Sequence, residues 1–152
     1  MTHRTPEQTA ALAAKLLWAG DRAAQAMGAE LIDVGPGRAT LAMVVRDDMV
    51  NGHDTAHGGY IFALADTAFA FACNSGGHTT VAAHCSVTFL RPGQRGDRLV
   101  ARAREVSRGG RSGLYDVTVS VGDKVIAEFR GHSRTVGGSF IDAADEQQKT
   151  KP

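Results

Sequence analysis

The chain has 152 residues, of which 43% are hydrophobic and 22% are charged, and its formal net charge is +1. A chain of this length fits one domain with a single core well, and two domains only poorly. The near balance of charge excludes a generally basic surface for nucleic acid, and no segment has the roughly 18 uninterrupted apolar residues of a membrane span, so we expect neither partner.

The N-terminal stretch carries the signals of a helix start. Thr5-Pro6-Glu7-Gln8 supplies a capping hydroxyl, a proline at the first helical position and a glutamine three residues after the cap. The helix should carry Leu12, Leu16 and Leu17 on one face, lose regularity at Gly20-Asp21 and end by Gly28. We expect this N-terminal helical segment to cover the core.

Two strands and a long helix should follow. Residues alternate between apolar and polar in Ala29 to Val34 and in Arg38 to Val45, and Gly35-Pro36-Gly37 between them is typical of a hairpin turn. From Gly58 to Asn74 the chain is rich in alanine and too long for an ordinary strand, which predicts a helix. Because apolar residues lie on nearly every side of this helix, other structure should enclose it.

The remainder reads mostly as sheet. Four strand-like runs are separated by Gly, Pro, Asp and Arg turns, namely Thr80 to Leu90, Arg98 to Val106, Ser112 to Val121 and Lys124 to Thr135. The pattern predicts an α+β domain over residues 1–138, with an antiparallel six-stranded sheet wrapped around a central helix. Residues 139–152 are polar, and we expect a disordered tail there.

One carboxylate is out of place in this pattern. Asp66 is the only ionisable carboxylate between Tyr60 and Cys73, in the middle of the central helix. Aspartate is a poor residue for a helix interior, and an unpaired buried carboxylate costs several kcal/mol. Asp66 therefore serves either as a general base or nucleophile, or as the partner of a neighbouring arginine or of solvent at a sheet edge.

Paired glycines mark the start of the same helix. The first amide groups of a helix lack intrahelical partners, and Gly58 and Gly59 let a ligand approach them closely. These amides and the positive end of the helix dipole suit an oxyanion, although a plain glycine-rich helix start is the alternative. Gly58 and Asp66 are eight residues apart, about 12 Å along the axis, so one carbonyl can meet both only if two copies pair with antiparallel central helices.

Two histidines and several arginines invite other interpretations. His53-Asp54-x-x-His57 superficially resembles a helical zinc motif, but glycines bracket it and aspartate replaces the catalytic glutamate, so we expect no metal. Arg108, Gly110 and Arg111 lie in a turn between two strands whose amides and guanidinium groups could receive a phosphate. Arg91 offers a second positive corner, and a solvated basic hairpin is the alternative for both.

The run Asn51-Gly52-His53-x-Thr55-x-His57-Gly58-Gly59-x-x-Phe62-x-Leu64-Ala65-Asp66-Thr67-Ala68-Phe69-Ala70 closely resembles the thioesterases of aerobic phenylacetate degradation, which have the hotdog fold. Further matches follow in the same order, at Phe89-Leu90-Arg91-Pro92-Gly93, Gly96-Asp97, Gly113-x-Tyr115-Asp116 and Phe129-Arg130-Gly131. The resemblance covers residues 10 to 138. It implies a central helix inside an antiparallel sheet, a dimer with active sites at its interface, and a tetramer made of two dimers.

The resemblance also implies roles for individual residues. Asp66 would activate water or attack the thioester, and the backbone N–H of Gly58 would polarise its carbonyl group. Asn51 and His57 would help to position the substrate, and Thr67 would lie beside the carboxylate as a hydrogen-bond partner.

Two further positions fall on the substrate-binding side of the motif. Gly59 follows the carbonyl-binding residue, and Tyr60 could narrow the acyl pocket. Ala56 and Tyr60 depart from the closest relatives, where a Cys and a Gln are often expected. The resemblance therefore supports thioester hydrolysis more directly than it supports a preference for a particular acyl group.

These observations favour an acyl-CoA thioesterase that hydrolyses phenylacetyl-CoA or hydroxyphenylacetyl-CoA without metal or redox cofactor, as a homodimer that assembles into a homotetramer. Cys73 and Cys85 lack a Cys-x-x-Cys spacing and lie in apolar runs, so we expect reduced core thiols and a cytoplasmic protein. Two alternatives remain. One is an acyl-CoA-binding regulatory module, although the N-terminal stretch has few basic residues for DNA contact. The other is a hotdog enoyl-CoA hydratase, which Asp48, Asn51 and His53 suggest only loosely.

Overall fold

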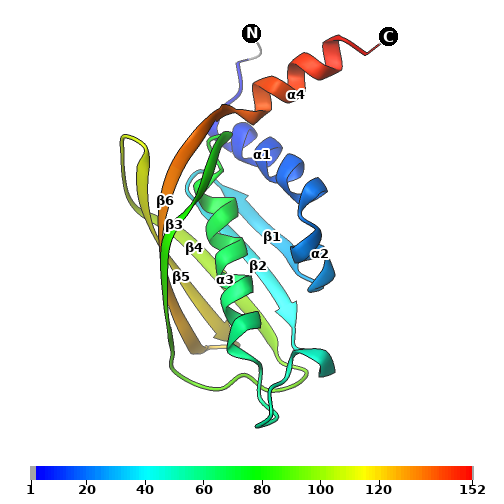
Figure 1. Ribbon diagram of the computed structural model, residues 1–152, viewed down its shortest axis with the longest axis vertical. Coiled ribbons are helices and arrows are strands. Elements are labelled where there is room, and N and C mark those ends of the chain that lie inside the picture. Colours follow the sequence, from blue (N-terminus) through cyan, green and yellow to red (C-terminus); the bar gives the residue numbers. More distant parts are fainter. Residues whose placement is uncertain (1–2, 152) are drawn as a thin grey trace.

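A computed structural model describes residues 3–151, and its largest element is one antiparallel sheet. The six strands lie in the order β1-β2-β4-β5-β6-β3. Their bounds are β1 (Glu30–Gly35), β2 (Arg38–Val44), β3 (His78–Phe89), β4 (Arg98–Gly109), β5 (Ser112–Val121) and β6 (Lys124–Ser139). Figure 1 shows the sheet curving around the central helix α3 (Gly58–Cys73). The expected α+β class with a six-stranded antiparallel sheet is confirmed.

Helix α3 lies deep against the concave side of the sheet because small and aromatic residues interlock there. Phe69 is 1% exposed, and its ring centroid lies 5.5 Å from that of Tyr115 and 5.8 Å from that of Phe129. On the facing strand β6, Gly131 leaves room for this ring, since a Cβ atom at that position would lie 2.8 Å from two carbons of Phe69. Ordinary contacts between carbon atoms are about 3.5–4.0 Å. The glycine therefore sets how closely α3 approaches the sheet.

The N-terminal helix α1 (Pro6–Gly20) starts with the predicted capping box. The Thr5 hydroxyl accepts from the Gln8 N–H at 3.2 Å, and the Gln8 side chain accepts from the Thr5 N–H at 2.9 Å. Its buried face differs from the prediction, because the fully buried residues are alanines and the three predicted leucines are only half-buried. Alanines let the helix backbone approach its neighbours closely. After a break at Asp21 the chain continues in the short helix α2 (Arg22–Ala26).

The predicted disordered tail is instead a helix in the structure. Helix α4 (Phe140–Lys149) begins where the Ser139 hydroxyl accepts from the Asp142 N–H at 3.1 Å. Ile141 is 4% exposed and packs over Gly77, and Asp145 forms an ion pair with Arg4 at 2.9 Å. The polar composition of this segment reflects its solvent face, while a few apolar positions anchor it near the N-terminal segment (Figure 1). Within residues 3–151, no helix is long and apolar enough to cross a membrane.

Candidate active site

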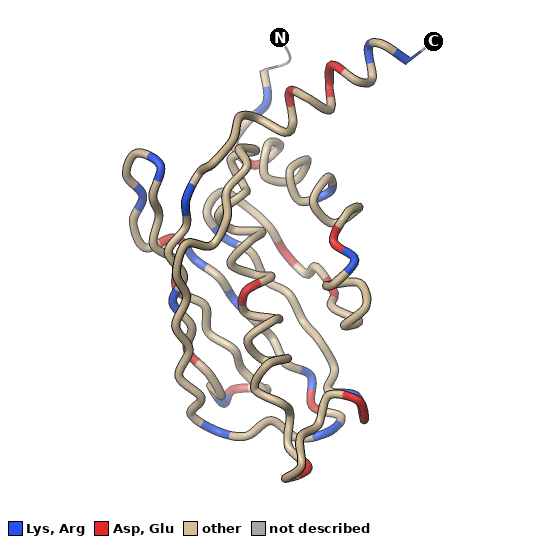
Figure 2. The backbone as a smooth tube through the Cα atoms, viewed as in Figure 1, with Lys and Arg blue, Asp and Glu red and all other residues tan. Residues whose placement is uncertain are grey.

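Asp66 lies half-buried in the middle of α3 and is the only charged residue of that helix (Figure 2). No arginine, lysine or histidine forms an ion pair with it within the described residues. The Cys85 thiol of β3 lies 4.0 Å from the carboxylate. Burial raises the pKa of Asp66 above its usual range, and the nearby charge of Asp21 raises it further. Within the described residues no arginine therefore pairs with Asp66, and the carboxylate is partly desolvated without a cation.

Thr67 was expected to hydrogen-bond to Asp66, and it does not. Its hydroxyl donates to the carbonyl of Ala63 at 2.6 Å, one turn back along α3. Threonine in a helix interior commonly makes this bond to its own backbone, and here it removes the hydroxyl from the carboxylate. The Asp66 carboxylate therefore receives no hydrogen bond from Thr67, and its Oδ1 accepts only the long 4.0 Å contact from the Cys85 thiol among the described residues.

The N-terminus of α3 presents one free amide. His57 is the N-cap, and its Nδ1 accepts from the Gly59 N–H at 2.9 Å. The Gly58 N–H has no acceptor within residues 3–151. Of the two glycine amides expected to hold an oxyanion, the Gly59 amide is therefore occupied and the Gly58 amide is open, at the positive end of the helix dipole.

The loop before α3 is shaped by Asn51. Its side-chain oxygen accepts from the N–H groups of His53 at 2.9 Å and Thr55 at 3.2 Å, and its side-chain amide donates to the Thr55 hydroxyl at 3.1 Å. Asn51 therefore orders the segment that delivers His57 to the helix start. His53 lies in a turn and His57 is the N-cap of α3, so the two histidines do not lie on one helix face as they do in a helical zinc motif.

Three of the predicted site residues meet at the N-terminal end of α3. Asn51, Gly58 and Arg91 line one cavity of about 360 Å³ together with Ile61 and Phe89. Arg91 is held there because its guanidinium donates to the carbonyl of Val125 at 2.8 Å. No sequence pattern had singled out Phe89 as a site residue, because it sits at the end of β3 and reaches Gly58 only through the fold. Nearby, Tyr60 packs edge-on to His57, with ring centroids 6.3 Å apart.

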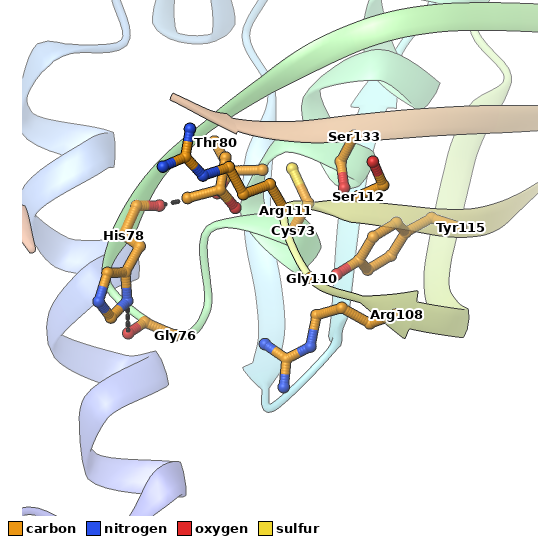
Figure 3. A pocket seen from close by; sticks show the side chains of 11 residues that line it. Cys73, Gly76, His78, Thr80, Arg108, Gly110, Arg111, Ser112, Tyr115 and Ser133 are labelled. Carbon is orange, nitrogen blue, oxygen red and sulfur yellow. Dashed lines mark hydrogen bonds between the residues drawn. The ribbon is translucent and has the colours of Figure 1, made fainter. Parts of the chain in front are cut away.

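The predicted phosphate-binding residues meet at the opposite end of α3. Arg108 of β4 and Gly110 and Arg111 of the β4–β5 turn line a cavity of about 230 Å³ with His78 and Thr80 of β3, as Figure 3 shows. Arg108 makes a long 3.8 Å contact with Glu105, and Arg111 has no ion pair within the described residues. Guanidinium donors around a hollow suit an anion. Arg91 is not part of this cluster.

The two clusters lie at opposite ends of one helix. Helix α3 has 16 residues, about 24 Å along its axis, with Gly58 at one end and Cys73, which borders the arginine cavity, at the other. Asp66 stands between them and lines neither cavity. Within one chain the open amide and the carboxylate therefore remain about 12 Å apart, as the sequence predicted.

Comparison with known proteins identifies relatives over most of the chain. Residues 53–128 match the family model described as Thioesterase superfamily. The acyl-coenzyme A thioesterase PaaI of Escherichia coli is 43% identical over 86% of this chain and 94% of its own length, and the structure of the E. coli PaaI protein from the phenylacetic acid degradation operon superposes with a TM-score of 0.87 over 89% of this chain and 99% of its own.

Two further solved structures resemble the fold at lower identity. A mutant of the phenylacetic acid degradation protein PaaI from Thermus thermophilus is 40% identical, covering 76% of this chain and all of its own, with a TM-score of 0.75. A protein from Streptococcus mutans bound to acetyl CoA is 28% identical over 73% of this chain and 90% of its own, with a TM-score of 0.70.

Proposed function

The chain belongs to the thioesterase superfamily, and we propose that it hydrolyses aryl-acyl thioesters of coenzyme A with Asp66 as the catalytic carboxylate. The observation that carries the proposal is a half-buried carboxylate in the middle of α3 that lacks a cation and has a raised pKa, together with an open amide at the start of the same helix. A thioesterase needs both a base and a polarised carbonyl, and these two groups supply them.

The proposed chemistry uses only these groups and water. Ionised Asp66 takes a proton from a water molecule, and the oxygen of that water forms a bond to the thioester carbon. The carbonyl oxygen gains the electron pair and is stabilised by the Gly58 N–H and the helix dipole. The tetrahedral intermediate then collapses, the carbon–sulfur bond breaks, and the thiolate of coenzyme A leaves and takes up the proton. We propose that this reaction needs neither a metal ion nor a redox cofactor.

Two copies of the chain must build each site. The Gly58 amide and Asp66 of one chain cannot reach the same carbonyl, so the amide comes from one protomer and the carboxylate from its partner. The free edge of the sheet supports such pairing, because β3 has 12 residues and is an end strand. Its Val81 and Phe89 are 46% and 50% exposed, and an unprotected strand edge of this length invites a second copy. We further propose that two such dimers form a tetramer.

The arginine cavity suits the phosphates of coenzyme A. Its donors are Arg108, Arg111 and the amides around Gly110, and it lies on the same chain as Asp66. The S. mutans relative bound to acetyl CoA supports a coenzyme A ligand for this fold. At the other end of α3, Gly59 and Tyr60 would border the acyl group beside the Gly58 amide.

We also propose that the acyl group of the substrate carries an aromatic ring. It rests on the E. coli and T. thermophilus relatives, which are named for phenylacetic acid degradation and are 40–43% identical. Two free cysteines, Cys73 and Cys85, fit a reducing compartment, so we place the reaction in the cytoplasm.

Release of free thiol from a panel of acyl-CoAs tests this function. The panel should contain phenylacetyl, hydroxyphenylacetyl, benzoyl and acetyl thioesters, with Asp66→Asn as the matched inactive control. We expect turnover to be fastest with the arylacetyl thioesters and to be lost in the variant. Tight binding of all four without thiol release would instead favour an acyl-CoA sensor, and hydration of an enoyl-CoA would favour the hydratase.

A further inference from the structure

Helix α4 takes no part in the proposed mechanism, yet two different contacts fix it to the rest of the chain. Ile141 is 4% exposed and is the buried residue of this helix. Asp145 accepts two hydrogen bonds from the Arg4 guanidinium, at 2.9 and 3.0 Å, and the two side chains are only 30% and 25% exposed. Ile141 and Asp145 are four residues apart, so they lie on one face of α4. An apolar anchor and an ion pair therefore hold the same face of the helix.

The base of α4 contacts the segment that leads into β3. We call this segment, residues 76–78, the 76–78 turn. Ile141 packs on Gly77 so closely that a Cβ atom there would lie 2.6 Å from the Cδ1 atom of Ile141. The Phe140 N–H donates to the carbonyl of Gly77 at 2.9 Å, and His78 pairs with the residue that caps α4 at the end of the β3–β6 ladder. The position of α4 and that of the turn are therefore linked by both packing and hydrogen bonds.

The 76–78 turn needs such support because of its composition. Two of its three residues are glycines, and Gly77 has a φ of +81°. Glycine loses more conformational freedom on ordering than any other residue. The other hydrogen bonds of the turn are local, since the Gly77 N–H donates to the carbonyl of Asn74 at 2.9 Å and the Thr80 hydroxyl donates to that of His78 at 2.9 Å. Packing by α4 is thus the contact that fixes the turn from a distant part of the chain.

The same turn forms one wall of the arginine cavity. Gly76 and His78 line this cavity together with Arg108 and Arg111 (Figure 3). A Cβ atom at Gly76 would lie 4.0 Å from the Nη1 atom of Arg108, so the turn and this guanidinium group are neighbours. A displacement of the turn would therefore change both the shape of the cavity and the position of its donors.

We propose that α4 is a positioning element for coenzyme A, because it fixes the 76–78 turn and thereby the wall of the cavity that receives the phosphates. This inference rests on the proposed function, which assigns the arginine cavity to coenzyme A. When α4 is released, the turn must be ordered anew each time the coenzyme binds. Ordering about one residue of backbone corresponds to a loss of about tenfold in affinity. Asp66 and Gly58 do not border this cavity, so the chemical step should be unaffected.

Ile141→Asp tests this role by placing a charge at the buried anchor. Its matched control is Ala143→Asp, which adds the same charge at an exposed position of the same helix. Both variants are assayed with phenylacetyl-CoA and with phenylacetyl-pantetheine, which has the same acyl group and arm but lacks the nucleotide and its phosphates. We expect Ile141→Asp to raise KM about tenfold for the CoA thioester alone, with kcat unchanged for both thioesters. The control should match wild type with both substrates.

Arg4→Gln is a second variant, and it keeps the test open if Ile141→Asp does not fold. It removes the ion pair with Asp145 and keeps the apolar anchor. Its matched control is Arg22→Gln, since Arg22 is exposed and forms no ion pair within residues 3–151. We expect KM for phenylacetyl-CoA to rise about two- to fivefold, the range of a partly exposed ion pair. Hydrogen exchange should be faster at residues 76–78 in this variant than in its control.

Two results would overturn the inference. One is an unchanged KM for phenylacetyl-CoA in a folded Ile141→Asp protein, or in Arg4→Gln if the first variant does not fold. The other is an equal rise in KM for the CoA and pantetheine thioesters, which would show that α4 acts through overall stability or the pantetheine arm and not through the phosphates.

Binding of coenzyme A itself separates this inference from the proposed function. Isothermal titration calorimetry with free coenzyme A requires no turnover, and the Kd should rise about tenfold in Ile141→Asp but not in Ala143→Asp. If the Kd changes in this pattern but no thioester is hydrolysed, the proposed function fails and the role of α4 stands. If thioesters are hydrolysed while Ile141→Asp changes neither the Kd nor KM, the role of α4 fails alone.

Discussion

The close approach of α3 to the sheet makes a sharp prediction for Gly131→Ala. The added Cβ atom would lie 2.8 Å from the Cε2 and Cζ atoms of Phe69, about 1 Å inside an ordinary carbon contact. Phe69 cannot move aside easily, because it is 1% exposed and packs between Tyr115 and Phe129. The whole of α3 must therefore shift outward or the ring must leave its preferred rotamer.

Overpacking of this kind typically costs about 1–3 kcal/mol. For a domain of this size each kcal/mol lowers the melting temperature by about 2–4 °C, so Gly131→Ala should melt about 2–12 °C below wild type. Because Asp66 lies on the same helix three residues before Phe69, the shift should also lower kcat for thioester hydrolysis. Thermal unfolding followed by circular dichroism and steady-state thiol release measure the two effects.

Gly138→Ala is the matched control for this substitution. It lies on the same strand, β6, and a Cβ atom there would meet nothing within 4 Å. We expect its melting temperature and its kcat to remain those of wild type. If Gly131→Ala melted like Gly138→Ala, the claim that this glycine sets the depth of α3 would be refuted.

Other predictions concern the site itself. Asp66→Asn should lower kcat by about 10²–10⁴, and wild-type thiol release should fall as pH drops through the raised pKa of Asp66. Because the pKa of Asp66 is raised, the folded protein binds this proton more tightly than the unfolded chain does. At pH values above the ordinary pKa of 3.8, the ionised carboxylate therefore lowers the free energy of unfolding. Asp66→Asn should therefore melt higher than wild type at pH 7, and this gain should vanish below that value; a variant that melts lower at pH 7 would contradict it. Gly58→Pro removes the open amide at the first helical position, where proline is favoured, and should lower kcat by about 10²–10³. Gly58→Ala keeps the amide and adds the same Cβ contact with Phe89, so it should lower kcat less. An equal loss of kcat in both variants would assign the effect to the contact with Phe89. Arg111→Ala should raise KM for acyl-CoAs about tenfold or more with kcat kept, and should weaken the salt dependence of KM; unchanged KM would remove the arginine cavity from the account. Burial raises the pKa of the Cys73 thiol to about 12, so it should react with a thiol reagent at pH 8 far more slowly in the folded than in the unfolded protein, and equal rates would contradict its burial.

Much of the architecture was predictable because local chemistry and tertiary structure agree. The capping box at Thr5 to Gln8 formed as predicted, since both of its hydrogen bonds lie within one helical turn. The alanine-rich helix from Gly58 was predicted one residue longer than observed, with Asn74 as its cap. Asp66 stood out for the same reason: a charge in a segment otherwise built for burial marks a conflict that function resolves.

The failures concern interactions between distant parts of the chain. Residues 140–149 look too polar for a core, and their helix depends on Ile141 packing over Gly77 and on the ion pair of Asp145 with Arg4, 141 positions away. The two groups of arginines had similar sequence signatures, yet Arg91 follows β3 at one end of α3 and Arg111 lies in a turn at the other. Spacing along the chain cannot tell the two ends of a sheet apart without the strand order.

Thr67 shows a smaller limit of the same kind. Sequence proximity to Asp66 suggested a hydrogen bond, but adjacent residues on a helix point in directions about 100° apart. The hydroxyl met the carbonyl of Ala63 instead. Adjacency in sequence is therefore weak evidence for contact on a helix.

Mixing two inactive variants tests the two-chain active site most directly. Asp66→Asn protomers keep the Gly58 amide, and Gly58→Pro protomers keep the carboxylate, so each hybrid dimer contains one complete site and one site that lacks both groups. After joint unfolding and refolding of equal amounts, we predict about one quarter of wild-type thiol release, since about half of the dimers are hybrids with one working site of two. If the mixture stays as inactive as its components while hybrid dimers are shown to form, the amide and the carboxylate do not act together across two chains, and the account of the active site is wrong.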